Sequence, residues 1–431
     1  MRIININSLI ICLLPIFLVL SRFLADLSVC ICGILFLLSV IKKKEWFYFN
    51  NNFFYFFLLF FIYILIRSIL TLNVVSIGTT IFYFRFGLFS LAVWHVINNN
   101  TKFLKFFFFT SAAVIFILSI DAIYQYYNGY NILGYPKHIY NKVSSFFGKT
   151  FIMGSYISKI FPIILGIFFY KKYYFFNKKY MYFEISFLFF ILSLAMILSG
   201  ERTALFLFFT YLFFLLILLQ LKKNIKIVIF FLYFFFVTLF FVHDSKIFDR
   251  YVTTVYDQIT LNKSYKESGI NSNYNKDYFI FSVDHHAHYQ VSYKMFKDNM
   301  VFGQGPKMFR ILCSNDKFKF EYKYSVNNLI NGCATHPHNT YMQLLAETGL
   351  VGFAFLLLFF IYVLFKLLFN LYLVYNKKIL SNFYNFKTCI LLVFFINFLP
   401  LVPNGNFFNN WLSIMYYLPV GFYLYILNRK S

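Results

Sequence analysis

Long apolar runs recur along nearly the whole of this chain of 431 residues. Many of them approach a length of about 20 residues, which is what a helix needs to cross the hydrocarbon layer of a membrane. Because a backbone in lipid must satisfy its own hydrogen bonds, such runs favour helices, and the alternating pattern of a membrane barrel is missing. The sequence therefore predicts an all-α polytopic membrane protein.

The runs predict about twelve transmembrane helices, at residues 8–21, 24–41, 53–71, 77–97, 103–127, 150–170, 181–199, 203–221, 225–242, 339–369, 386–402 and 408–428. No cleavable signal peptide is predicted, because the first run lacks a clear small-residue cleavage site and further runs follow it. The chain divides into a membrane bundle of about nine spans at 1–242, one large polar loop at 243–338, and a bundle of about three spans at 339–431.

Lysine and arginine are distributed unevenly among the connectors, and cytoplasmic connectors are the ones that carry an excess of them. With both chain ends in the cytoplasm, the outer connectors near 72–76 and 400–407 carry none, and the large loop lies outside. The outer connector 128–149 departs from the rule because it contains three lysines. Since the basic residues are spread over separate connectors, the net charge of +24 does not indicate a nucleic-acid partner.

The loop 243–338 is the only long polar stretch. Its middle, LNKSYKESGINSNYNKDY, has the Asn, Ser and Lys content of a flexible surface segment. Tyr289, Tyr293 and Phe296 then recur at helical spacing, and the sequence GQGP follows as a turn. We therefore expect short helices in this loop, with one of them lying over the outer membrane face.

Cys313 and Cys333 are the two cysteines of the outer loop, whereas the other four lie in apolar runs. In an oxidising compartment the pair is expected to form a disulfide. Closing a loop of about 20 residues would stabilise the fold by roughly 3 kcal/mol. The alternative is a zinc site made by Cys333, His336 and His338, but four well-spaced ligands are not evident, so we predict no metal.

Six of the eight histidines lie in the outer loop or at its edge, and polar loops collect some histidine by chance. His338 is the candidate general base, because it lies where a Pro-containing segment meets a membrane helix and can accept a proton near neutral pH. Asn339 is the predicted N-cap of that helix. Glu347 lies deeper, where a charge needs a partner, and it either orients a neighbouring group or faces the bundle interior. His336 is expected to be a loop or acceptor-side neighbour.

Most of the 39 basic residues are lysines, so each arginine is informative. Arg202 lies in the tight outer connector SGERTALF, where its planar set of donors fits a diphosphate at headgroup level. The alternative is an interfacial arginine that only reaches toward water. Arg85 lies within a span, where it either pairs with an acid such as Asp121 or lines a groove for lipid phosphate. Arg310, close to Cys313, is a further basic candidate.

Two segments at the end of the loop carry a set of recognisable motifs. KMFKDNMVFGQGPKMFR contains a helix followed by G-x-G-x-x-x-F, and HPHNTYMQLLAETGLVGF contains His-Asn-x-Tyr and Glu-x-Gly-x-x-Gly. Together with the turn SGERTAL, they resemble the O-antigen ligase/polymerase family of bacterial inner-membrane glycosyltransferases. The matching residues are Gly303, Gly305, Phe309, His338, Asn339, Tyr341, Glu347, Gly349 and Gly352. The span number, the orientation and the single large loop extend the resemblance over most of the chain.

The resemblance implies a metal-independent enzyme of lipopolysaccharide biosynthesis that needs no cofactor. It would transfer a glycan from undecaprenyl diphosphate to a lipid A–core sugar hydroxyl at the periplasmic face, with His338 as base and Arg202 on the diphosphate. Many members carry a second arginine where an ungapped match puts His285 here. A protonated imidazole would hold a phosphate more weakly, and Arg310 or Arg85 are the possible substitutes.

The acceptor is the open point. Ligase activity is favoured by the HPHN and Glu-x-Gly signature and by the position of the loop after the ninth predicted span. A polymerase, which adds lipid-linked repeats to one another, is the first alternative. A transporter of lipid-linked glycans without chemistry is the second, and it would require charged residues deep within several spans, where few occur here.

Overall fold

A computed structural model describes the chain except for residues 1, 101, 139–141, 176–180, 221–225, parts of 228–244, 261–279, 324–328, 377–381 and 429–431. Its N-terminal part consists of α1 (Arg2–Leu20), α2 (Arg22–Lys43), η1 (Trp46–Phe49), α3 (Asn52–Leu70), α4 (Val74–Ile81), α5 (Phe84–Asn99), α6 (Phe103–Asn128), η2 (Ser145–Phe147), α7 (Met153–Phe175), α8 (Met181–Leu198) and α9 (Arg202–Leu218). The loop contains α11 (Ser245–Phe248), the π-helical turn η3 (Asp249–Thr253), α12 (Thr254–Thr260), α13 (Val283–Asp298), α14 (Phe309–Leu312), β1 (Glu321–Lys323) and β2 (Leu329–Asn331). The chain ends with α15 (Thr340–Tyr375), α16 (Asn382–Asn397) and α17 (Asn410–Asn428).

The helical polytopic architecture is confirmed. Among the described residues, 6 helical segments are long and apolar enough to cross a membrane, and shorter apolar helices accompany them. Every predicted span coincides with one of these helices or with α17, except 225–242, which lies largely outside the described residues. The figure of about twelve spans stays a prediction.

One predicted span is broken in the structure. The run 77–97 is divided between α4 and α5 at Phe82. The Phe82 carbonyl accepts from the Arg85 backbone N–H at 3.3 Å and from the Arg85 guanidinium at 3.0 Å. The helix α15 is longer than a bilayer requires, and it is interrupted at Gly349, where φ is 62°. Its first part, up to Thr348, is therefore a separate short helix that precedes the long apolar part of α15.

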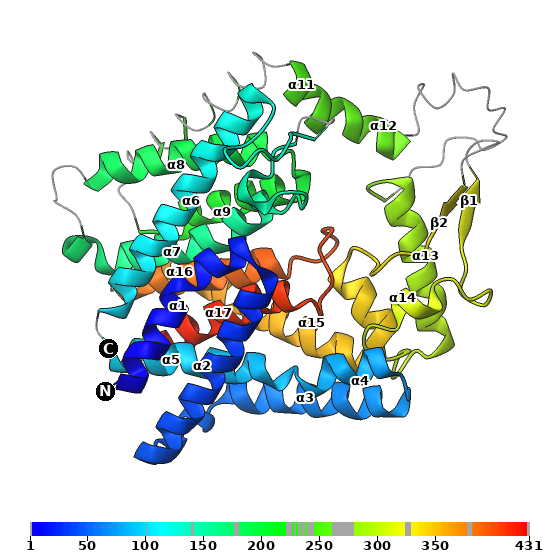
Figure 1. The fold of residues 1–431 in the computed structure, drawn as a ribbon, viewed down its shortest axis with the longest axis horizontal. Helices are drawn as coiled ribbons and strands as arrows, with labels where there is room; N and C mark the ends of the chain where they lie inside the picture. Colours follow the sequence, from blue (N-terminus) through cyan, green and yellow to red (C-terminus); the bar gives the residue numbers. More distant parts are fainter. Residues whose placement is uncertain are drawn as a thin grey trace.

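The later elements of the loop gather at one end of the bundle. Figure 1 shows α13, α14 and the β1–β2 hairpin together on one side, while both chain ends lie on the opposite side. α13 packs against the start of α15. A small apolar core joins them, and it contains Val291, Met295, Phe309, Cys313, Phe318 and Ala346.

The hairpin is an addition to the sequence prediction, which expected short helices in the loop. β1 and β2 are antiparallel, with Tyr322 opposite Ile330. Each strand has three residues, so neither is long enough to display an alternating pattern in the sequence.

Candidate functional site

The N-terminus of α15 is fixed by side chains from its own first turn. The Asn339 side chain accepts hydrogen bonds from the backbone N–H groups of Tyr341 and Met342, both at 3.0 Å, as expected of an N-cap. The Asn339 amide also donates to the Val402 carbonyl at 3.3 Å. The Tyr341 hydroxyl donates to the Phe398 carbonyl at 2.6 Å. The mouth of α15 is thus tied to the segment that joins α16 to α17.

His338 immediately precedes this cap in an unusual backbone conformation. Its φ of 56° lies in the left-handed region, which non-glycine residues rarely adopt and which costs about 1–3 kcal/mol. The Asn404 N–H donates to its carbonyl at 2.8 Å and holds it there. Its half-buried imidazole has no hydrogen-bond partner among the described residues. The surrounding structure therefore fixes the position of His338 and leaves its ring nitrogens available to a substrate.

Three other histidine rings surround His338. The ring centroid of His336 lies 4.2 Å away, that of His288 lies 5.4 Å away, and that of His285 lies 5.7 Å away. The α13 histidines are anchored, since Nδ1 of His288 lies 3.0 Å from the Gly332 carbonyl and Nδ1 of His285 lies 2.7 Å from the Ser282 hydroxyl. We refer to His285, His288, His336 and His338 as the histidine cluster.

Burial and mutual proximity lower the pKa of three members of this cluster, His285, His336 and His338. Burial lowers the pKa of His338 below its usual value of 6.5, and His288 lowers it further, while Asp284 opposes the shift. Burial, with His338 next in importance, lowers the pKa of His285 to about 4 and that of His336 to about 3. A neutral His285 is a weak phosphate ligand, so it does not replace the charge of an arginine on α13.

The zinc alternative lacks its ligands. The structure joins Cys313 and Cys333 by a disulfide, with the two Cα atoms 4.9 Å apart, so Cys333 has no thiolate to offer a metal. Among the described residues, no group of His, Cys, Asp and Glu has the arrangement of a metal site. The disulfide instead links α14 to the segment that leads from β2 to the histidine cluster.

The glycine motifs are explained by a close contact between two backbones. The Gln304 and Gly305 N–H groups donate to carbonyls just before the α15 break, at 2.9 and 2.7 Å. A Cβ atom on Gly303 would lie 2.5 Å from the backbone nitrogen of Thr348. Both Gly303 and Gly349 also have positive φ, at 65° and 62°. The two glycine motifs therefore dock the loop onto the interrupted helix.

Two residues of α3 reinforce this contact, and the sequence analysis missed both. The Tyr63 hydroxyl donates to the Thr348 carbonyl at 2.5 Å, and Nε of Arg67 donates to the Phe302 carbonyl at 3.0 Å. A tyrosine and an arginine near the outer end of a span are common interfacial residues, so their positions alone gave no signal.

Arg202 lies at the start of α9, beside a turn that another arginine braces. Its Nη1 donates to the Gln258 side chain of α12 at 2.7 Å, and its Nε and Nη2 have no partner among the described residues. Nε and Nη2 of Arg250 both donate to the Gly200 carbonyl at 3.1 Å. The charge of Arg202 contributes to the lowered pKa of His285, which places Arg202 near the histidine cluster.

Comparison with protein families bears on this arrangement. Residues 187–357 match the family model described as O-antigen ligase. Over this segment, the chain is similar to the O-antigen ligase family. The matched segment contains Arg202, the histidine cluster and the docked glycine motifs. No curated protein matches the chain.

The O-antigen ligase family has ligase- or polymerase-type activity, which is glycosyl transfer on lipid-linked glycans in a bacterial membrane. The matched segment begins within α8 and ends within α15, so it leaves out α1 to α7. Arg85 and Asp121 therefore lie outside the match, whereas Arg310 lies inside it.

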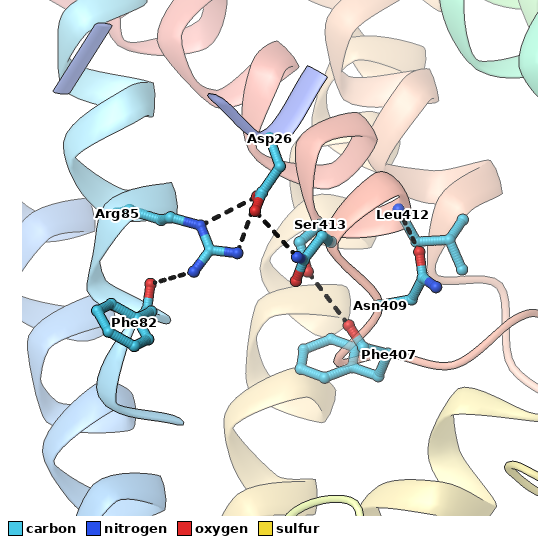
Figure 2. Close-up of polar contacts among 8 residues, drawn as sticks. Asp26, Phe82, Arg85, Phe407, Asn409, Leu412 and Ser413 are labelled. Carbon is cyan, nitrogen blue, oxygen red and sulfur yellow. Dashed lines mark hydrogen bonds and ion pairs between the residues drawn. The ribbon is translucent and has the colours of Figure 1, made fainter. Parts of the chain in front are cut away.

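Arg85 is engaged by neighbours in the bundle. Figure 2 shows its guanidinium facing Asp26 of α2, to which Nε and Nη2 donate at 3.1 and 2.8 Å. The expected pairing with Asp121 was wrong, because the Asp121 carboxylate instead accepts from the Ser145 hydroxyl at 2.6 Å. With the Phe82 carbonyl as a second acceptor, the described contacts of Arg85 are those of a residue that joins helices.

Arg310 lies exposed on α14. Burial lowers the pKa of the half-buried neighbour Lys307, and the positive charge of Arg310 lowers it further. The described residues provide no hydrogen-bond partner for the Arg310 side chain. Its role as a phosphate ligand stays a prediction.

The Glu347 side chain links α14, the start of α15 and, through Gln343, the segment between α16 and α17. Its buried carboxylate accepts from the Phe309 N–H at 3.0 Å and from the Gln343 amide at 2.9 Å, and the Gln343 carbonyl oxygen accepts from the Phe407 N–H at 2.9 Å. Of the two roles that the sequence leaves open, these contacts favour the orientation of neighbouring groups.

Glu347→Gln should destabilise the protein by about 1–3 kcal/mol, because an amide N–H would then face the Gln343 N–H or the Phe309 N–H in a buried space. The measurement is the midpoint of thermal unfolding in detergent. The exchanged pair Gln343→Glu/Glu347→Gln restores one donor and one acceptor, and should recover part of the loss. An unchanged midpoint for Glu347→Gln would mean that the carboxylate is not the acceptor of both bonds.

Proposed function

We propose that this protein transfers a glycan from undecaprenyl diphosphate to a lipid A–core sugar hydroxyl. The reaction takes place at the periplasmic face of the bacterial inner membrane, with both chain ends in the cytoplasm. It uses neither a metal nor a cofactor. His338 is the base, and Arg202 binds the diphosphate of the donor.

One observation carries the proposal. His285 contacts His338 through their rings, at a centroid distance of 5.7 Å, and its pKa responds to the charge of Arg202. The candidate base thus contacts His285, and the candidate phosphate ligand acts on it electrostatically. These two observations support one shared site for the imidazole and the guanidinium edge, within the segment that matches the O-antigen ligase family model.

The chemistry follows from the two groups. The neutral imidazole of His338 takes the proton of the acceptor hydroxyl, and the hydroxyl oxygen attacks the anomeric carbon of the donor sugar. The bond from this carbon to the diphosphate oxygen breaks, and the bonding electrons leave with the diphosphate. Nε and Nη2 of Arg202 can donate in parallel to a phosphate, which stabilises the charge that develops there.

The supporting residues hold the base in place. Asn339 and Tyr341 fix the start of α15, and Glu347 fixes the loop and the α16–α17 connection against it. His336 has the closest ring to His338 among the histidine cluster, and we propose it as the neighbour on the acceptor side. Positioning of this kind contributes to rate because the reacting atoms must meet in a narrow range of geometries.

The pH dependence of transfer reports on the base. Because burial lowers the pKa of His338 below 6.5, the neutral form persists to lower pH than it would for a free imidazole. The midpoint of the acid limb of the rate profile should therefore lie below pH 6.5. A midpoint above pH 6.5 would contradict a buried neutral base.

The test of the function is reconstitution of the purified protein in vesicles with a lipid-diphosphate glycan and lipid A–core. The proposal predicts glycan-capped lipid A–core and released undecaprenyl diphosphate. A lengthened lipid-linked chain would identify a polymerase instead. An unaltered donor that has moved between leaflets would identify a transporter.

A further inference from the structure

Three cationic side chains meet at the turn between α8 and α9. Arg202 starts α9, and Arg250 of η3 donates twice to the carbonyl of Gly200 within the turn, at 3.1 Å. The Lys142 side chain packs against the same glycine, since a Cβ atom on Gly200 would lie 2.7 Å from Cγ of Lys142. The three residues come from segments that are far apart in the sequence, namely the 128–149 connector, the α8–α9 turn and the outer loop.

The carboxylate of this turn is already engaged elsewhere. Glu201 lies between Gly200 and Arg202, but its oxygens accept from the backbone N–H groups of Gly154 and Ser155, at 2.6 and 3.1 Å. These are N–H groups of the first turn of α7, which a carboxylate satisfies well. Glu201 is thus directed toward α7 and offsets the three cations only in part.

Lys142 has no described structural partner for its charge. Its ammonium group makes no hydrogen bond and no ion pair with any residue that the structure describes, although the side chain is half-buried. Burial lowers its pKa, and the charges of Arg250 and Arg202 lower it further, while Glu201 opposes the shift. A half-buried cation beside two others is unfavourable unless an anion binds there.

We infer that Lys142 and Arg250 join Arg202 in binding the diphosphate of a lipid-linked donor. The inference rests on the proposed function and names residues of the same donor site. It supplies the positive charge that is missing on α13, where the neutral His285 occupies the position of an arginine. It also gives a role to one of the three lysines of the 128–149 connector, which departs from the charge rule that the other outer connectors follow.

The charges fit the course of the reaction. A glycan-linked lipid diphosphate is a diester and carries one negative charge on each phosphate. When the bond to the sugar breaks, the leaving oxygen adds a further negative charge. Three cations therefore match the leaving group better than they match the donor, and interactions that strengthen in this way accelerate the chemical step.

The binding of a short lipid diphosphate tests this site directly. The full-length protein in detergent would be titrated with farnesyl diphosphate and with farnesyl monophosphate. Lys142→Gln should weaken diphosphate binding about ten-fold, as expected for the loss of one charge-assisted contact, and should affect the monophosphate less. Lys142→Arg should restore binding. Lys149→Gln, an exposed lysine of the same connector, is the matched control and should bind as the wild type does.

Arg250 is tested through a conservative change, because it also braces the turn. Arg250→Lys should weaken diphosphate binding, since an ammonium group does not reproduce the paired donors of a guanidinium. Thermal unfolding of each variant separates lost binding from lost structure. Wild-type affinity in both Lys142→Gln and Arg250→Lys would overturn the inference.

The inference and the proposed function can fail separately. If the wild type transfers glycan and Lys142→Gln binds diphosphate with full affinity, the function stands and the inference fails. If the wild type transfers nothing in vesicles but binds diphosphate in a Lys142-dependent way, the inference stands and the function fails. Competition by inorganic diphosphate identifies the diphosphate, and not the lipid chain, as the recognised group.

Discussion

His338→Asn is expected to reduce glycan transfer by about 10²- to 10⁴-fold, the usual contribution of a general base. Asparagine is the suitable replacement, because it tolerates the left-handed backbone that His338 adopts at φ 56°. The variant should therefore fold and insert normally while it lacks a group that accepts a proton at neutral pH. The measurement is the initial rate of capped acceptor formation in vesicles that contain equal amounts of protein.

A matched change distinguishes the base from its surroundings. His286 lies on α13 but outside the histidine cluster, so His286→Asn should transfer glycan at close to the wild-type rate. His338→Ala removes the same imidazole but places alanine at a strained φ, so its loss of activity would be accompanied by lower stability. If His338→Asn retains the wild-type rate, His338 is not the base.

Arg202→Lys is expected to lower kcat/KM for the donor by about 100-fold, because lysine keeps the charge but loses the paired donors. Only Nη1 of Arg202 is used within the protein, for the Gln258 side chain at 2.7 Å. The edge formed by Nε and Nη2 remains for a phosphate, which is the geometry of bidentate recognition. The measurement is the rate at subsaturating donor, with the acceptor held in excess.

Arg22 provides the control for this change. It is an exposed arginine at the start of α2, in another outer connector, and the described residues give it no hydrogen-bond partner. Arg22→Lys should leave transfer close to the wild-type rate. Equal rates for Arg202→Lys and Arg22→Lys would make Arg202 an interfacial anchor, which is the alternative that the sequence left open.

The local features of the site were predictable from sequence. Asn339 caps α15 because a side-chain oxygen at the start of a helix satisfies backbone N–H groups, whatever the rest of the fold does. Cys313 and Cys333 were predicted as a disulfide because they are the only two cysteines of the outer loop. Arg202 stood out because an arginine in so short an outer connector has few structural uses.

The features that depend on distant segments were not predictable. Arg85 pairs with Asp26 and not Asp121, and nothing in either local sequence distinguishes the two acids. Lys142 and Arg250 meet Gly200 only because the connector and the outer loop fold over the same turn. The contact between the two glycine motifs could not be predicted for the same reason, although the sequence analysis named the glycines themselves.

The central claim is tested most directly by measuring the capped acceptor and the released undecaprenyl diphosphate in the same vesicles. The vesicles contain purified protein, lipid-diphosphate glycan and lipid A–core, and the reaction is run with and without a chelator. The account predicts that the wild type releases one undecaprenyl diphosphate for each glycan-capped acceptor, and that the chelator has no effect. His338→Asn should both cap the acceptor and release the diphosphate far more slowly than the wild type. Capped product formed by His338→Asn at the wild-type rate, or a reaction that stops when the chelator is added, would contradict it.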